Sequence, residues 1–284
     1  MIDDRHLNTA SRPKVAGIDT AAPNAARVAD YLNSGRDNFE ADRRAARAMI
    51  AAAPAMAAVV PAVLAFHQRV VRFLALEVGL RQFLDVGTGL PRVQSGTEIA
   101  QSVDPACRVV YADNDPMVLT HVRAFWRSTP QGAFAALDAK LTDPAALLAG
   151  AAATLDFRQP VAVLLPSTLP FIPDTARVAA IVTELLRTMS PGSYLALCHV
   201  ASDLEPALAA AAGEWNMTSS LPVTLRSRDE VAALTAGLEL VQPGLVPVDQ
   251  WRPAFGARLD PRVPVYAVLA RKPRLIRQRP GARP

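Results

Sequence analysis

Short apolar runs alternate with amphipathic segments between residues 81 and 199. The runs are rich in Val, Leu and Ala, and their length suits buried strands better than helices. Strands are predicted at 81–86, 108–113, 133–137, 161–166 and 193–199, and helices at 95–102, 116–127, 143–152 and 174–189. This alternation predicts a doubly wound α/β fold, in which a mostly parallel sheet carries helices on both faces.

The residues before the first predicted strand have a different pattern. Residues 1–20 are polar and are predicted to be loose, whereas residues 21–76 carry helical patterns at 24–32, 38–52 and 61–76. Asn33-Ser34-Gly35 is a typical helix stop, and Asp37 with Glu40 three residues later predicts a cap for the second helix. We therefore expect a helical cap or lid over residues 21–76.

Further elements follow the last central strand. Helices are predicted near 203–213 and 227–237, and strands near 239–246 and 264–271. The α/β domain is expected to span residues 77–272 and to be followed by a basic tail, residues 273–284. The last fourteen residues carry six of the positive charges, while the whole chain has a net charge of only +4. This favours a solvated tail and predicts no nucleic-acid partner.

Composition indicates a soluble cytoplasmic protein. The first residues, MIDDRHLN, are charged and lack the apolar stretch of a secretion signal. Cys107 and Cys198 are the only cysteines and have no metal-ligand spacing, so no metal site is expected. Residues 49–66 carry no charge, but this stretch is rich in alanine and contains Pro54 and Pro61, which favours a packed helical surface over a membrane span.

The most informative segment is RQFLDVGTG, a strand that runs into a glycine turn. Asp85 lies near the strand end, and Gly87, Thr88 and Gly89 follow in a turn that lets the backbone approach a ligand. The next strand ends at Asp113, whose carboxylate is placed to accept hydrogen bonds from both hydroxyls of a ribose. Carboxyl ends of parallel strands share one crevice, so a nucleoside site is predicted there. An ordinary strand-to-helix turn without a ligand is the alternative.

The turn distinguishes between nucleoside cofactors. A dinucleotide fingerprint requires a third small residue, but the run is Gly87-Thr88-Gly89-Leu90-Pro91-Arg92, so NAD is the weaker choice. The D-x-G-x-G form followed by D-x-x-P-x-x-L, at Asp113 to Leu119, resembles the class I S-adenosylmethionine (SAM) methyltransferases.

A narrower resemblance covers about Ile18 to Lys272. The segments APNAARVADYLNSGRDNFEADRRAA, RQFLDVGTGLP, RVVYADNDPMVLTH, PGSYLALCHV and VDQWRP are similar to an actinobacterial family of SAM-dependent methyltransferases, formerly catalogued as a domain of unknown function. The resemblance implies a seven-stranded sheet with one antiparallel edge strand, and SAM as cofactor. Our first hypothesis is a methyltransferase that acts on a small-molecule acceptor, in secondary metabolism. A homodimer is compatible with the sequence.

The superfamily also implies roles for individual residues. Asp85 would hold the methionyl amino group, Asp113 the ribose, Asn114 would lie beside the adenine edge, and Asp138 with Ala139 would meet the adenine amino group. Each carboxylate has a purely structural alternative. Asp85 is also placed to cap its turn, Asp113 to cap a helix (although Asp115 is better placed), and Asp138 to be a loop residue.

The amino-terminal block contributes the remaining cofactor candidates. Arg27 and Tyr31 lie four residues apart on one helix face, and Asn38 and Phe39 follow the turn at Gly35. These four residues are predicted to close over the cofactor. The alternative is a helix pair packed on the sheet edge, with Tyr31 in the core.

Methyl transfer needs a protein base only when the acceptor is poorly acidic or protonated. His199 ends a strand beside the crevice and is the base candidate, while a hydrogen-bonded strand-end histidine is the alternative. Histidines of the family pattern are replaced at Asn24, Thr97 and Pro170. A SAM-binding protein without methyl transfer is therefore a second hypothesis, and a nucleic-acid or protein methyltransferase is a third.

Overall fold

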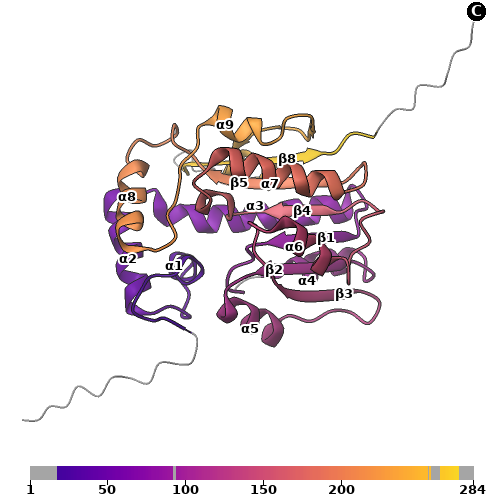
Figure 1. Cartoon of the computed structure of the whole chain (residues 1–284), viewed down its shortest axis with the longest axis horizontal. Helices are drawn as coiled ribbons and strands as arrows, with labels where there is room; N and C mark the ends of the chain where they lie inside the picture. Colours follow the sequence, from indigo (N-terminus) through magenta and orange to yellow (C-terminus); the bar gives the residue numbers. More distant parts are fainter. Residues whose placement is uncertain (1–17, 92–93, 255, 257–262, 275–284) are drawn as a thin grey trace, which may run out of the picture.

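The computed structural model describes residues 18–91, 94–254, 256 and 263–274. The described part contains one mixed sheet of eight strands in the order β3-β2-β1-β4-β5-β8-β6, with β7 also paired to β8 (Figure 1). Strands β1 to β5 are parallel, and β8 is antiparallel to β5, β6 and β7. The strands are β1 Gln82–Val86, β2 Arg108–Asp113, β3 Ala133–Asp138, β4 Ala162–Leu165, β5 Tyr194–Val200, β6 Glu239–Leu240, β7 Val246–Pro247 and β8 Val265–Arg271.

Helices cover both faces of the sheet, as predicted. Successive residues of a strand point to opposite faces, so that Phe83 packs with α3, α4 and α5, and Leu84 packs with α6, α7 and α9. The helices are α1 Ala25–Leu32, α2 Glu40–Ala52, α3 Met56–Leu76, α4 Gly96–Val103, α5 Pro116–Phe125, α6 Pro144–Ala151, α7 Thr175–Thr188, α8 Leu208–Thr218 and α9 Arg228–Ala233. The predicted doubly wound α/β class is confirmed.

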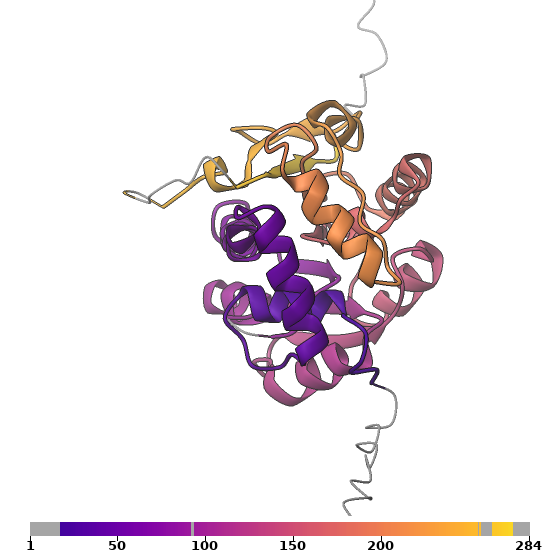
Figure 2. The same ribbon diagram turned by 90° about the vertical axis from the view of Figure 1, so that its left-hand side faces the viewer.

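The predicted cap divides into two parts. The long helix α3 packs on the sheet, where Phe66, Val70 and Leu74 are buried in the core. Helices α1 and α2 instead lie off the sheet, and α8 packs against α2. We call α1, α2 and α8 the cap layer. It faces the carboxyl ends of the parallel strands, at the left of Figure 1, and Figure 2 looks onto it.

Several element boundaries differ from prediction. Helix α3 begins at Met56 and includes Pro61 in its second turn, where the missing N–H removes one backbone hydrogen bond that the rest of this long, well-packed helix tolerates. Helix α8 lies five residues later than predicted. The strand predicted at 239–246 forms two short strands, β6 and β7, which gives eight strands instead of seven. At the start of α2, Asp42 rather than Asp37 accepts from the backbone N–H of Phe39 (2.8 Å).

Helix α3 is long and apolar enough to cross a membrane by length and composition alone, and 39% of its most apolar window is buried inside the protein. The uncharged stretch at 49–66 is split between α2 and α3. Core helices of soluble proteins pass the same length and composition test, and α3 forms part of the main core. The predicted loose residues 1–17 and tail residues 275–284 lie outside the described residues.

Candidate functional site

The glycine turn after β1 brings the backbone close to the loop after β4. Gly87 has a φ of +73°, and its N–H donates to the carbonyl of Ala112 (2.8 Å). A Cβ added at Gly87 would overlap the side chain of Thr168. Gly89 also has a positive φ, +68°, but has open space around it. Glycine is therefore required at Gly87 for two reasons, namely its conformation and this close approach.

Asp85 lies at the floor of the turn and is paired with a histidine from α3. Its Oδ2 lies 2.8 Å from Nε2 of His67, and the two side chains are 4% and 13% exposed. Its other oxygen, Oδ1, is buried without a hydrogen-bond partner. Burial by itself lowers the pKa of His67, but the charge of Asp85 and the hydrogen bond to it outweigh burial and raise the pKa above its usual value.

The pairing of His67 is a functional feature that the sequence did not identify. His67 falls within the helix predicted at 61–76, and nothing in the local pattern links it to Asp85, eighteen residues away. The link between the two residues is spatial, and α4 packs beside the imidazole, where a Cβ at Gly96 would make an ordinary van der Waals contact with Cε1 of His67 at 3.5 Å.

The segment that follows the turn is held by its own hydrogen bonds. Ser95 and Glu98 form a capping box at the start of α4. The hydroxyl of Tyr111 accepts from the N–H of Thr97 (2.6 Å) and hydrogen-bonds its Oγ1 (2.8 Å). Thr97, which stands where the family pattern has a histidine, is therefore buried and committed to Tyr111.

Asp113 ends β2, as predicted, and faces the glycine turn. Its Oδ2 accepts from the N–H of Gly89 (3.2 Å) and its Oδ1 from that of Asp115 (3.0 Å). Burial raises the pKa of Asp113, against the lowering effect of these backbone hydrogen bonds. Asp115, not Asp113, caps α5 by accepting from the N–H groups of Met117 and Val118. Asp113 is thus left beside the crevice rather than used as a helix cap.

The predicted adenine-side residues lie next to Asp113. Asp138 is the register partner of Asp113 in the parallel pair β2–β3, and its side chain is exposed. The N–H of Ala139 donates to the carbonyl of Asp113 (3.1 Å). Asn114 is exposed between Asp113 and Asp115. The structure brings these predicted residues together, while their contact with a cofactor stays a prediction.

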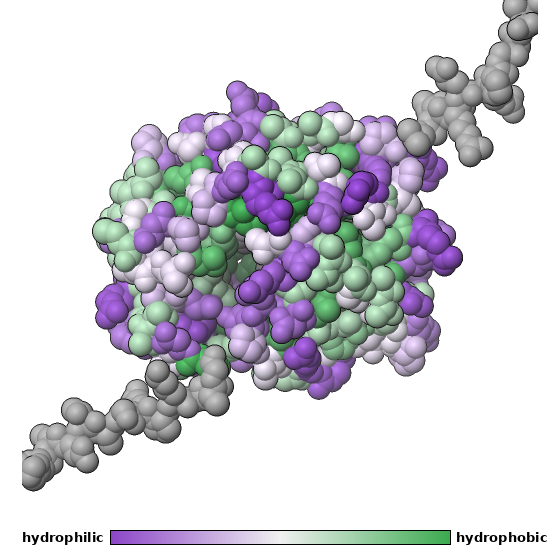
Figure 3. Space-filling view, viewed as in Figure 1, coloured by the Kyte–Doolittle hydropathy of each residue, from purple (hydrophilic) through white to green (hydrophobic). Residues whose placement is uncertain are grey.

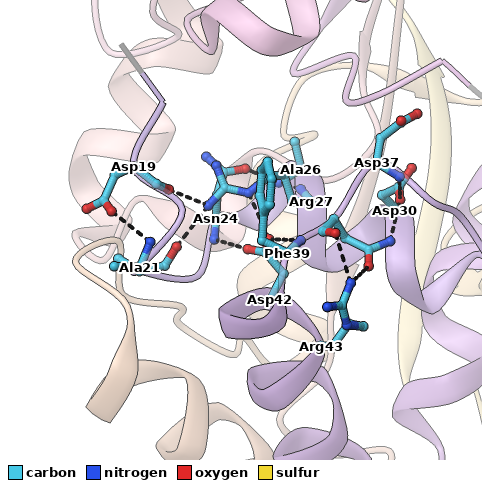
Figure 4. Close-up of polar contacts among 12 residues, drawn as sticks. Asp19, Ala21, Asn24, Ala26, Arg27, Asp30, Asp37, Phe39, Asp42 and Arg43 are labelled. Atoms are coloured by element: carbon cyan, nitrogen blue, oxygen red, sulfur yellow. Dashed lines mark hydrogen bonds and ion pairs between the residues drawn. The ribbon is translucent and has the colours of Figure 1, made fainter. Parts of the chain in front are cut away.

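The predicted lid residues are bonded mainly within the cap layer and the loops beside it (Figure 4). Arg27 is buried and pairs with Asp42 (Nε–Oδ2 2.8 Å), and its guanidinium lies over the ring of Phe39, 5.2 Å from the centroid. Asn38 donates to Asp30 (2.7 Å). Tyr31 is half-buried against the core. Arg27 and Asn38 therefore hold the cap together, and their predicted contact with the cofactor stays a prediction.

One side chain ties the cap to the loop after β2. Asn24 caps α1 by accepting from the N–H of Ala26 (2.9 Å), and its Nδ2 donates to Oδ2 of Asp115 (2.8 Å). Asn24 is a second position where the family pattern has a histidine. The side-chain amide of Asn24 therefore links the start of α1 to Asp115 at the start of α5. This bond places the cap layer directly beside Asp113.

His199 is enclosed rather than open to the crevice. His199 is only 1% exposed. Its Nδ1 lies 2.8 Å from the carbonyl oxygen of Val200, and its Nε2 lies 2.8 Å from Nη1 of Arg226. Burial lowers the pKa of His199 to about 4. Because Arg226 can only donate, Nε2 accepts and the ring is neutral. This geometry favours the alternative of a hydrogen-bonded strand-end histidine over a general base.

Arg226 also fixes the loop after β4. It donates to the carbonyls of Leu169 (3.2 Å) and Ile172 (2.7 Å) and to Oγ1 of Thr175 (3.2 Å). This loop carries Thr168, whose Oγ1 is buried without a partner. Two unpartnered polar oxygens, from Asp85 and Thr168, therefore lie at neighbouring strand ends. Figure 3 shows a small hollow on this side of the molecule, with both hydrophobic and hydrophilic residues around its rim.

The sheet order, the glycine turn and the carboxylates at the carboxyl ends of β1 and β2 together define a class I SAM-dependent methyltransferase domain. Residues 11–273 match the family model described as S-adenosyl methyltransferase, and the chain belongs to this family. Its cofactor is SAM. No significant match was found among curated proteins.

Two solved structures from actinobacteria are similar over nearly the whole chain. A DUF574 family protein from Streptomyces avermitilis shares 39% identity, with 90% of this chain and 99% of that chain covered and a TM-score of 0.85. A proposed methyltransferase from Thermobifida fusca shares 35% identity, with coverage of 91% and 98% and a TM-score of 0.84. The resemblance given by the sequence motifs is confirmed.

Proposed function

We propose that this protein transfers the methyl group of SAM to a small-molecule acceptor in the cytoplasm, as part of secondary metabolism. The observation that supports a small acceptor is the cap layer. Helices α1, α2 and α8 face the carboxyl ends of the strands (Figure 1), and the surface on this side of the molecule carries a small hollow (Figure 3). A cap over the crevice limits the access of water, whose exclusion favours methyl transfer from a sulfonium.

The residues present fit the cofactor. The buried, unpartnered Oδ1 of Asp85 suits an ammonium group, since a buried carboxylate oxygen needs a donor. Asp113 lies at the adjacent strand end, where a ribose would meet it, and the absence of a side chain at Gly87 keeps the turn close to Thr168. SAM supplies the electrophilic methyl group when bound, and these residues would hold its methionyl and ribose parts.

The loop after β4 is the proposed acceptor wall. Phe171 from this loop is half-buried, and its ring centroid lies 6.2 Å from that of the buried Trp215 of α8, so the cap layer supports the loop. Arg226 holds the loop through its carbonyls. We infer an acceptor with an apolar or aromatic surface that packs against Phe171.

We further infer that the acceptor atom is nucleophilic without help from a histidine base. Among the described histidines, His199 is neutral and enclosed and His67 is engaged with Asp85, while His121 lies on α5 near Asp37 (3.8 Å). A neutral amine or a thiolate needs no protein base, unlike an aliphatic alcohol.

A SAM-binding protein without methyl transfer is the second candidate. It is favoured by the same positions that lack the family's histidines, because Thr97 and Asn24 are committed to hydrogen bonds with Tyr111 and Asp115. The two functions share the cofactor pocket and differ in whether S-adenosylhomocysteine (SAH) is formed when a panel of amine, thiol and phenol acceptors is supplied.

The test begins with calorimetric titration of SAM and SAH into wild type, Asp113→Ala and Asp104→Ala. Asp104 lies at the opposite end of the sheet, paired with Arg81, and serves as the matched control. We expect Asp113→Ala to weaken binding by about tenfold or more, equivalent to about 1.4 kcal/mol, and Asp104→Ala to leave it unchanged. Absence of binding by folded wild type would contradict the proposed function, and binding without turnover of any acceptor would favour the second candidate.

A further inference from the structure

The pairing of His67 with Asp85 places a titratable cation against the carboxylate that faces the cofactor. His67 comes from α3 and Asp85 from β1, and Nε2 and Oδ2 are 2.8 Å apart in a buried environment. Only Oδ1 of Asp85 is left without a partner. The imidazole therefore fixes which carboxylate oxygen is available and how it is oriented.

The pair can exist in two charge states. In both, Nε2 keeps its proton and donates to Asp85, so that the imidazole gains or loses its charge at Nδ1. With Nδ1 protonated the pair is neutral overall, and with Nδ1 deprotonated it carries one negative charge. An incoming ammonium group is attracted by the second state more strongly than by the first.

Few other charged groups act on His67. Tyr111 from β2 remains a neutral phenol because burial raises its pKa, and Glu98 of α4 is engaged by Ser95. On α3 itself, Arg72 is exposed and Arg69 donates to the carbonyls of Val248 (2.8 Å) and Trp251 (2.9 Å). The negative charge of Asp85 is thus what favours protonation of the His67 imidazole. A positive group bound to Asp85 weakens that effect.

We propose that His67 is a positioning residue for the methionyl end of the cofactor: it holds Asp85 through Nε2 and gives up its positive charge when the cofactor's amino group binds to Oδ1. This inference rests on the proposed function, because it needs a ligand with an amino group in the crevice. Binding then releases one proton from Nδ1 to solvent, and cofactor affinity rises with pH.

The test compares wild type with His67→Gln, whose amide nitrogen can replace Nε2 as a donor to Asp85 but cannot titrate. The probe is SAH, which has the amino group without the sulfonium charge. The α-amino group of SAH also loses its proton as the pH rises, so the informative quantity is the ratio of the two dissociation constants at each pH between 6 and 9. His121→Gln, on α5, is the matched control for loss of another histidine.

We expect the affinity of wild type, relative to His67→Gln, to rise by up to about tenfold per pH unit and then level off. His121→Gln should follow wild type. Identical pH profiles for wild type and His67→Gln, with both binding SAH, would overturn the proposal and leave the proposed function intact. Failure of wild type to bind SAH would overturn the function on which the proposal rests.

A second measurement does not depend on the folding of a variant. The pKa of His67 can be followed by NMR of the imidazole in wild type, with and without saturating SAH. We expect that pKa to fall when SAH binds. An unchanged or raised pKa would overturn the proposal even if His67→Gln does not fold.

Discussion

Gly87 and Gly89 both have a positive φ, but only Gly87 lies against another side chain. The two positions therefore distinguish a glycine required by backbone conformation alone from one also required by close packing. We predict that Gly87→Ala destabilises the protein by more than about 2 kcal/mol, because backbone strain is joined by overlap with Thr168. Gly89→Ala should cost only the strain, about 1 kcal/mol. Urea unfolding of both variants measures the difference, and equal losses would show that the overlap is relieved by movement of the Thr168 loop.

His67 also gives a prediction about stability without ligand. Its pKa in the folded protein lies above the value of about 6.5 expected when unfolded. Between these two pKa values the folded state binds more protons than the unfolded state, so the stabilisation is present below about pH 6.5 and is lost as pH rises through the folded pKa. The free energy of unfolding of wild type relative to His67→Gln should therefore fall with rising pH, and a constant difference would contradict the charged pair.

At these positions the sequence predicted which residues lie at the crevice better than it predicted their contacts. The spacing of Asp85, Gly87 and Asp113 predicted one crevice because parallel strands end at a common edge. It did not identify His67, because its link to Asp85 depends on how α3 crosses the sheet. It placed His199 correctly at a strand end. It did not predict that the side chain is enclosed, since Arg226 comes from a loop twenty-seven residues later.

At the scale of elements, α5 and α6 begin in similar ways but have different neighbours. Asp115 caps α5 and also accepts from Asn24 of the cap, whereas Asp143 caps α6 by accepting from Ala146 (3.1 Å). Each Asp→Ala substitution should cost about 1 kcal/mol through loss of the helix cap. Only Asp115→Ala should also speed amide hydrogen exchange in α1 and α2. Similar exchange in both variants would mean that Asn24 does not hold the cap in place.

The central elements were predictable because their hydrophobic periodicity and the residues at their ends agree with the fold. Strands β1 to β5 lie within one or two residues of their predicted ranges. Helices α3 and α8 were harder to place, since alanine-rich segments give weak periodicity, and Pro61 lies inside α3 instead of at its start. The edge strands β6 and β7 are two residues each, too short for an alternating pattern to define.

For the whole molecule, the end of the sheet defines where the chain can be shortened. Lys272 donates through Nζ to the carbonyls of Leu186 (2.7 Å) and Met189 (2.6 Å), which joins the end of β8 to α7. A chain ending at Arg274 should keep its SAH affinity and its activity on a small acceptor. A chain ending at Ala270 should be less stable in thermal unfolding, because it lacks both bonds of Lys272. Loss of activity in the longer of the two would instead support a polyanionic partner.

The arrangement of layers followed from the pattern of strands and helices, whereas the makeup of the cap layer did not. Helix α8 joins α1 and α2 only through tertiary packing, and nothing in residues 208–218 marks them as partners of residues 40–52. The hydrophobic pattern specifies which face of a helix is buried, but not which helix covers it.

The bond between Asn24 and Asp115 joins residues 91 positions apart, and α2 packs on a helix that lies still later in the chain. During synthesis α1 and α2 are made before both of these partners, since Asp115 follows β2 and α8 follows β5. Contacts this distant in sequence are closed late in folding, after local structure has formed. The cap layer can therefore be completed only after α8 has been made, and this side of the crevice stays uncovered until then.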